Sequence, residues 1–171
     1  MSNCGVSLRF QGDGFHFVSG INATDASMAG VIIQSTHNIL TNVNSSDNNG
    51  TGIIIFGSDN TLNQVTVEEN SLDGIITFAD RILISDSQVS SNEPSGIVIQ
   101  GSDDSSFIQN TFNSNSSFGM FVSGLGQTGN QMIGNTALNN GSIDLIDLNG
   151  NCAGAIWLGN TFDSANEACI E

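Results

Sequence analysis

The residues best suited to acid–base chemistry recur at a constant interval along the chain. His37, Asp59, Arg81 and Asp103 follow one another at equal spacings. Two carboxyl groups beside basic side chains could act as general acid and general base on a glycosidic bond, so these four residues are the candidate catalytic residues. In the alternative interpretation, opposite charges alternate along this column only to relieve repulsion between carboxylates.

The same interval runs through the apolar residues and identifies the elements that would carry these side chains. A motif of glycine followed by alternating apolar residues begins at Gly30, Gly52, Gly74, Gly96 and Gly119, where only the last interval is longer, by one residue. An earlier copy begins at Gly5, and we assign the three extra residues between Gly5 and Gly30 to the loop 11–14. A fixed period of this kind is typical of repeat architectures.

Further columns share the period and predict strands. Val18, Leu40, Leu62 and Ile84 keep the same interval, with Phe107 one residue late, and asparagines stand four residues before four repeat glycines, at Asn48, Asn70, Asn92 and Asn115. Short alternating runs separated by Gly, Asn, Ser and Asp indicate strands joined by turns. Successive coils should stack as parallel strands about 4.8 Å apart, with an asparagine ladder and repeat glycines at positive φ.

These glycine and asparagine columns resemble those of the right-handed parallel β-helix proteins of the pectate-lyase-like superfamily, over roughly residues 5–148. The resemblance implies an all-β, right-handed, single-stranded parallel β-helix (a solenoid) of about six to seven coils, each of about 22 residues. We assign residues 1–148 to the coils and residues 149–171 to a C-terminal capping segment of the same domain. The superfamily includes lyases, polygalacturonases, epimerases, phage tailspikes and non-catalytic surface proteins, so the fold does not choose the function.

The C-terminal segment resembles the closing segment of many secreted β-helix proteins. It contains Cys152, Trp157 and Cys169. The resemblance implies a disulfide between Cys152 and Cys169 that staples the last coil, with Trp157 buried beneath it at the end of the apolar stack. Two free thiols in a reducing compartment are the alternative. Cys4 is left over, and would be buried in the first coil or paired with an upstream cysteine.

Composition excludes several classes of partner. The chain has 2 Lys+Arg and 17 Asp+Glu, for a net charge of −15. This charge argues against binding to nucleic acid or anionic membranes, and acidic polysaccharides would be repelled unless calcium bridged the two surfaces. No stretch is apolar enough to span a membrane. We expect no cofactor or metal centre, although calcium could bind turn carboxylates, for example Asp47, Glu68, Glu69 and Asp73.

Alternation also predicts which side chains face outward. If Ile53 and Ile55 point into the core, one outward row contains Ser7, Ile32, Ile54, Ile76, Val98 and Phe121, and the next row contains Phe56 and Phe78. An apolar stripe on a soluble protein usually has a partner. A segment of the chain could cover it, a second copy could bury it, or its phenylalanines could stack against sugars. We favour a contact within the chain or between copies over ligand binding.

No catalytic signature of the superfamily is complete in this sequence. Only Asp103-Asp104 and Arg81-Ile82 remotely resemble the polygalacturonase motifs. We therefore predict a non-catalytic extracellular β-helix module with a structural or glycan-binding role, which self-associates through the apolar face. A carbohydrate-active enzyme, or its truncated core, is the alternative. Met1–Cys4 lacks the features of a signal peptide, and we expect a native start upstream of Met1 for a secreted or cell-surface protein.

Overall fold

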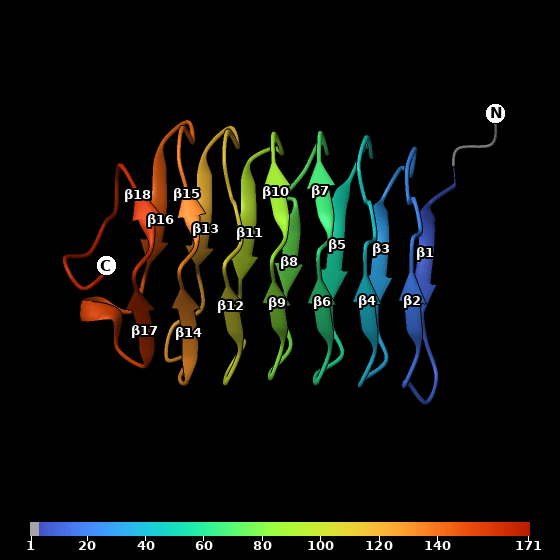
Figure 1. Ribbon diagram of the computed structural model, residues 1–171, viewed down its shortest axis with the longest axis horizontal. Helices are drawn as coiled ribbons and strands as arrows, with labels where there is room; N and C mark the ends of the chain where they lie inside the picture. Colours follow the sequence, from blue (N-terminus) through green and yellow to red (C-terminus); the bar gives the residue numbers. More distant parts are fainter. Residues whose placement is uncertain (1–3) are drawn as a thin grey trace.

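The computed structural model describes residues 4–171, which form one right-handed solenoid whose coils are stacked along its long axis (Figure 1). The expectation that the native chain begins upstream of Met1 concerns residues outside this range. Each coil passes through up to three short parallel strands, one in each of three sheets. The predicted parallel β-helix is therefore confirmed.

Three sheets line the sides of the solenoid, and we name them A, B and C. Sheet A contains β1 (Val6–Phe10), β3 (Ala29–Ile33), β5 (Thr51–Ile55), β8 (Ile75–Thr77), β11 (Ser95–Ile99), β13 (Phe118–Val122) and β16 (Ile143–Asp147). Sheet B contains β2 (Phe17–Ser19), β4 (Ile39–Thr41), β6 (Thr61–Asn63), β9 (Leu83–Ser85), β12 (Ser106–Ile108), β14 (Asn130–Ile133) and β17 (Ala155–Leu158). Sheet C contains β7 (Thr66–Glu68), β10 (Gln88–Ser90), β15 (Thr136–Ala137) and β18 (Thr161–Phe162), linked by isolated bridges.

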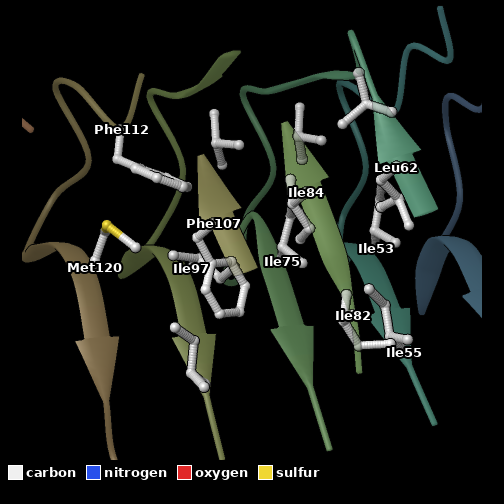
Figure 2. Packing of buried hydrophobic residues seen from close by; sticks show 14 of the residues in the cluster. Ile53, Ile55, Leu62, Ile75, Ile82, Ile84, Ile97, Phe107, Phe112 and Met120 are labelled. Atoms are coloured by element: carbon white, nitrogen blue, oxygen red, sulfur yellow. The ribbon is translucent and has the colours of Figure 1, made fainter. Parts of the chain in front are cut away.

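A continuous apolar core fills the interior because identical positions of successive coils stack in register. In sheet A, Ile53, Ile75 and Ile97 are paired and fully buried. In sheet B, Leu62, Ile84 and Phe107 form the corresponding column, and Figure 2 shows both columns pointing into the interior. Burying one such side chain contributes about 1.5–3 kcal/mol, so the stacked core is the main source of stability.

The predicted asparagine ladder is present, and it has two companions. The Nδ2 group of each asparagine donates to the Oδ1 atom of the next at 2.8–3.2 Å, through a column of the buried Asn48, Asn70, Asn92 and Asn115 and the half-buried Asn140. Shorter ladders join Asn38 to Asn60 at another corner, and Asn110, Asn135 and Asn160 at the third. These bonds satisfy buried amides and tie each coil to the next.

The repeat glycines are needed for a reason different from the one predicted. None of the five has a positive φ. A Cβ atom on Gly74 would lie 2.6 Å from the carbonyl oxygen of Gly96 and 2.7 Å from Nδ2 of Asn92. Positive φ values fall instead on polar corner residues, such as Asp47 at 57° and Glu69 at 56°. The glycines therefore make room for the asparagine ladder, and the prediction of positive φ was wrong.

The register of the first coil also differs from the prediction. β1 pairs with β3 at a step one residue longer than the repeat interval, so Arg9 lies beside Ile32 and Ser7 does not. β2 then pairs with β4 at the repeat interval, which places Phe17 beside Ile39. Gly5 is consequently not an earlier copy of the repeat glycine, and the loop 11–14 does not hold three extra residues.

The C-terminal end of the solenoid is covered by residues 149–171. Cys152 and Cys169 form a disulfide with a Cα–Cα distance of 6.0 Å. β17 and β18 continue sheets B and C, and Gly150–Cys152 forms a short 3-10 turn, η1. Trp157 ends the core column of sheet B at 5% exposure, and its indole N–H donates to Oδ2 of the buried Asp147 at 3.1 Å. The implied disulfide and buried tryptophan are both present.

Candidate functional site

The candidate catalytic residues lie at the corner that follows sheet A, which we call the charged corner. His37, Asp59 and Arg81 each have a positive φ there and succeed one another in adjacent coils. The Nε and Nη2 atoms of Arg81 donate to the two carboxylate oxygens of Asp59 at 2.6 and 2.9 Å. The hydrogen bond from Arg81 lowers the pKa of Asp59, and the same bond raises the pKa of Arg81. Asp59 is therefore an ionised partner, whereas a general acid needs a raised pKa.

Asp103 does not belong to this column, contrary to the prediction. Sheet A pairs Ile76 with Val98 at the repeat interval, whereas sheet B pairs Leu83 with Ser106, at a step one residue longer. The segment that joins β11 to β12 is therefore one residue longer than the segment that joins β8 to β9. Asp104, with a φ of 52°, takes the place next to Arg81.

The carboxylate of Asp103 instead accepts a hydrogen bond from a backbone N–H group of the next coil. Its Oδ1 atom accepts the backbone N–H of Thr128 at 2.7 Å, and its own N–H donates to Oδ1 of Asp80 at 3.0 Å. The other outlying member, His37, stacks on the ring of Phe15 with a centroid distance of 4.8 Å. The structure thus brings the side chains of Arg81 and Asp59 together, whereas Asp103 contacts Arg81 through its backbone carbonyl, which accepts the Arg81 N–H at 2.9 Å, and directs its carboxylate to Thr128. This geometry favours the interpretation in which opposite charges alternate along the column only to relieve repulsion between carboxylates.

The apolar stripe follows the predicted row along sheet A. Backbone pairing places its first set of side chains side by side, namely Ile32, Ile54, Ile76, Val98 and Phe121. Ile32 is only 4% exposed, whereas the flanking Phe56 and Phe78 are 50% and 41% exposed. The accessible part of the stripe is therefore centred on the middle coils.

The two exposed phenylalanines of this stripe cover one another. Their rings are stacked at a centroid distance of 5.3 Å and an angle of 7°. A sugar stacks against the face of an aromatic ring, but here Phe56 and Phe78 each cover part of one face of the other. This arrangement suits an apolar protein contact better than a sugar platform.

Sheet C carries an uncharged polar column that sequence analysis missed. Its members are paired coil by coil and none is buried: Asn22, Asn44, Thr66, Gln88, Thr111, Thr136 and Thr161. We call this column the polar ladder. A groove of about 230 Å³ borders it and is lined by Asn44, Ser46, Asp47, Thr66, Glu68 and Glu69. The ladder presents one hydroxyl or amide group per coil, which are the groups that bind the hydroxyls of a saccharide.

The carboxylates considered for calcium do not converge. Within residues 4–171, no three side chains of the metal-ligating types lie close enough together to hold an ion. Asp73 accepts the backbone N–H of Ser95 at 3.1 Å, and burial raises the pKa of Asp73. In the same part of the chain, no helix is long and apolar enough to cross a membrane.

Comparison with known families agrees with the coil geometry. The family model described as a right-handed beta helix region matches residues 3–171. The chain belongs to the right-handed β-helix family. No curated protein matches this β-helix in sequence.

Solved structures with the same fold include proteins named for polysaccharides. A variant of periplasmic alginate epimerase AlgG is 18% identical with a TM-score of 0.73, and the match covers 88% of this β-helix and 39% of that chain. Pectate lyase Pel9A is 15% identical with a TM-score of 0.58, and the match covers 91% of this β-helix and 54% of that chain. The enzymatically active domain of tailspike protein 2 from bacteriophage CBA120 is 13% identical with a TM-score of 0.65, and the match covers 89% of this β-helix and 23% of that chain. The β-helix spans about two fifths of the epimerase, and at these identities the likeness concerns the fold.

One of the two missed features left a signal in the sequence, and the other needed a different search. The late position of Phe107 marked the inserted residue that removes Asp103 from the charged corner. The polar ladder was hidden because it mixes asparagine, threonine and glutamine, and because its step is longer between Thr136 and Thr161 than between Asn44 and Thr66. A search for shared hydrogen-bonding capacity, instead of shared residue type, would have found it.

Proposed function

We propose that this β-helix is a non-catalytic module of the cell exterior that binds an uncharged polysaccharide and self-associates through its apolar stripe. The observation that carries the binding proposal is the polar ladder. It contains seven uncharged hydrogen-bonding residues in a chain with a net charge of −15. An extended polysaccharide lying along the solenoid axis would meet a new hydroxyl or amide group about every 4.8 Å.

Charge separates this proposal from the activities of the similar structures. Those proteins are named for alginate and pectate, which are acidic polymers. This chain has two arginines and no lysine, and Arg81 is bound to Asp59. Repulsion between a polyanion and the acidic surface therefore supports a neutral ligand.

The charged corner supports the non-catalytic part of the proposal. Asp59 is held ionised by Arg81, and the Asp103 carboxylate accepts a backbone N–H. Neither group is a proton donor poised across a cleft from a base. The Cys152–Cys169 disulfide supports a location outside the reducing cytosol, because such bonds persist in oxidising compartments.

Affinity electrophoresis in gels containing polysaccharides tests the binding proposal. Neutral glucans and mannans should retard the protein, whereas polyuronates should not. Replacing Thr111 and Thr136 by valine keeps their shape but removes two hydroxyls, and should weaken retardation about tenfold or more. Thr41→Val with Thr61→Val, on sheet B, is the matched control and should bind normally.

Two outcomes would overturn this proposal. Equal losses in both double variants would mean that the polar ladder is not the binding surface. Release of reducing ends or unsaturated products, abolished by Asp59→Asn, would instead place the chain among carbohydrate-active enzymes. Self-association through the stripe predicts a smaller solution mass for Phe56→Ser with Phe78→Ser, and an unchanged mass would contradict it.

A further inference from the structure

The row that contains the two exposed phenylalanines is symmetric about the gap between β5 and β8. The register of sheet A places Gln34, Phe56, Phe78 and Gln100 in consecutive coils, each directly after its strand, and all of them are exposed. Reversing the order of the coils leaves this row the same, since glutamine replaces glutamine and phenylalanine replaces phenylalanine. A surface of this kind can meet a copy of itself across a two-fold axis.

The same face of the solenoid has no charge that would repel a second copy. The strands β3, β5, β8, β11 and β13, with the residue that follows each, contain no acidic or basic residue. The whole chain has 17 acidic residues and a net charge of −15. Acidic surfaces of two such chains repel one another, whereas two copies of this face do not. The apolar stripe therefore suits a second copy of the chain.

The charged corner borders this face, and its charges alternate. His37, Asp59, Arg81 and Asp104 have φ values of 58°, 61°, 53° and 52° in successive coils. The corner follows the row of phenylalanines closely, since two residues separate Phe56 from Asp59. When a column that alternates between basic and acidic residues and has an even number of members is reversed, each basic position faces an acidic one. With His37 protonated, the corner is thus complementary to itself in the reversed order, whereas like charges meet in the same order.

Arg81 retains hydrogen-bond donors for a second carboxylate. Its Nε and Nη2 atoms bind Asp59, whereas its Nη1 atom has no acceptor among residues 4–171. The side chain of Arg81 is 53% exposed and that of Asp59 is 28% exposed. Because a guanidinium group presents donors on two sides, Arg81 can bind Asp59 of its own chain and Asp59 of a second copy. The result is a network of charges, which contributes more than an isolated exposed pair.

We propose that two copies of this chain pack face to face through sheet A with their solenoids antiparallel, about a two-fold axis that runs along the strands between β5 and β8. This arrangement places Phe56 against Phe78 of the second copy. It places Asp59 against Arg81 of the second copy, and pairs the other members of the charged corner in the same way. The inference rests on the self-association proposed above, and adds the orientation of the copies and the charges that select it.

A pair with parallel solenoids is the competing arrangement. Its two-fold axis runs along the solenoid, so the charged corner of one copy meets the opposite border of sheet A in the other. Arg81 there approaches Asp73 of the second copy, because both residues belong to the coil of β8. The equivalent border positions of the neighbouring coils are uncharged, so Asp59 and Asp104 find no basic partner. The parallel pair therefore satisfies one charge of the corner, whereas the antiparallel pair satisfies every one.

Exchanging charges within the corner tests the antiparallel arrangement. Asp59→Arg makes the centre of the corner basic, and Arg81→Asp makes it acidic. The column already holds both residue types at positive φ, so both replacements suit their backbone. Each variant alone brings like charges together across the axis, and its dissociation constant should exceed that of the parent chain about tenfold or more. An equimolar mixture should restore the parent affinity, because a basic corner then faces an acidic one.

Light scattering during size-exclusion chromatography over a concentration series measures these affinities, in a Cys4→Ser background because Cys4 is exposed. The chain that carries both exchanges is the matched control. It keeps the ion pair within the chain and the complementarity between copies, so it should associate like the parent. Asp73→Asn should leave the dissociation constant unchanged.

The possible results separate this arrangement from the stripe contact on which it rests. A pair weakened by Asp73→Asn, with no recovery in the mixture, would identify parallel solenoids and overturn the proposal. No recovery in the mixture, while Phe56→Ser/Phe78→Ser dissociates the pair, would overturn the orientation and keep self-association through the stripe. A monomeric parent at every concentration would overturn both, and would not bear on polysaccharide binding by the polar ladder.

Discussion

At the C-terminal end of the solenoid, Trp157 closes the core and donates to a buried carboxylate, and a disulfide fixes the segment around it. At the N-terminal end, Phe15 and Phe17 are exposed beside a hollow, and β1 and β2 have described neighbours on one side only. A stack of parallel strands has two ends that it cannot satisfy by repetition. The described residues cover the core at the C-terminal end, which we call the closed end, and lie on one side only of β1 and β2, which we call the open end.

The largest effect is expected from the aromatic residues that mark the two ends. Trp157→Ala should lower the free energy of unfolding by about 3–5 kcal/mol, because it opens a cavity and removes the indole donor to Asp147. Phe17→Ala should change it by less than about 0.5 kcal/mol, because the ring is mostly exposed. Urea unfolding at several protein concentrations measures both and separates any contribution from association. Equal losses would mean that the two ends are closed equally well.

Removing the disulfide tests the same contrast with cysteines. Cys152→Ser with Cys169→Ser opens a loop closed across 17 residues. The expected loss is about 3 kcal/mol, through the greater freedom of the unfolded chain. A reducing agent should lower the melting temperature of the parent protein to the same extent. Cys4→Ser, at the open end, should have no effect, and a comparable loss there would contradict the assignment of the staple.

The fold and the closed end were predictable because each depends on features repeated or marked in the sequence. The evenly spaced columns require stacked coils, since only in-register stacking buries Ile53, Ile75 and Ile97 together. Cys152, Trp157 and Cys169 are distinctive residue types in a chain with three cysteines and one tryptophan. The sequence therefore predicted the end that is closed.

The charged corner was harder to predict because its composition depends on a single inserted residue. One residue between β11 and β12 exchanges Asp103 for Asp104 beside Arg81. A shift of one residue is invisible to a spacing argument that tolerates small loop variations, but it turns a side chain to a different environment. The open end was likewise misaligned, because the first coil lacks the repeat glycine that sets the register elsewhere.

The asparagine ladder connects the two ends, and its middle is the next place to test. Asn92 is fully buried, and its Nδ2 atom donates to Asn115 at 3.2 Å. Asn92→Ala should cost about 1–3 kcal/mol, because it leaves buried groups of two adjacent coils without partners. Asn22→Ala, on the exposed face of sheet C, is the matched control and should be nearly neutral. Thermal unfolding followed by circular dichroism would compare them, and a neutral Asn92→Ala would remove the ladder from the sources of stability.

The ladder ends at Asp144, which gives the closed end a pH dependence. Burial of Asp144 opposes its ionisation, but hydrogen bonds from Asn140, Asp163 and Ser164 outweigh burial and lower its pKa. Between that lowered pKa and the ordinary carboxyl value, the unfolded chain binds more protons than the native protein. The free energy of unfolding therefore falls as the solution is acidified through this range.

Asp144→Asn should remove this part of the acid sensitivity while keeping an acceptor toward Asn140. Its destabilising effect should be greatest at neutral pH, where the carboxylate is ionised, and should shrink below about pH 4, so that stability depends less steeply on pH. Asp13→Asn, in the exposed loop of the open end, changes the same net charge and should leave the slope of stability against pH unaltered. Urea titrations at a series of acidic pH values provide both slopes. If the two variants flattened the curve equally, the acid sensitivity would come from net charge, and the hydrogen-bonded carboxylate of the closed end would have no special part in it.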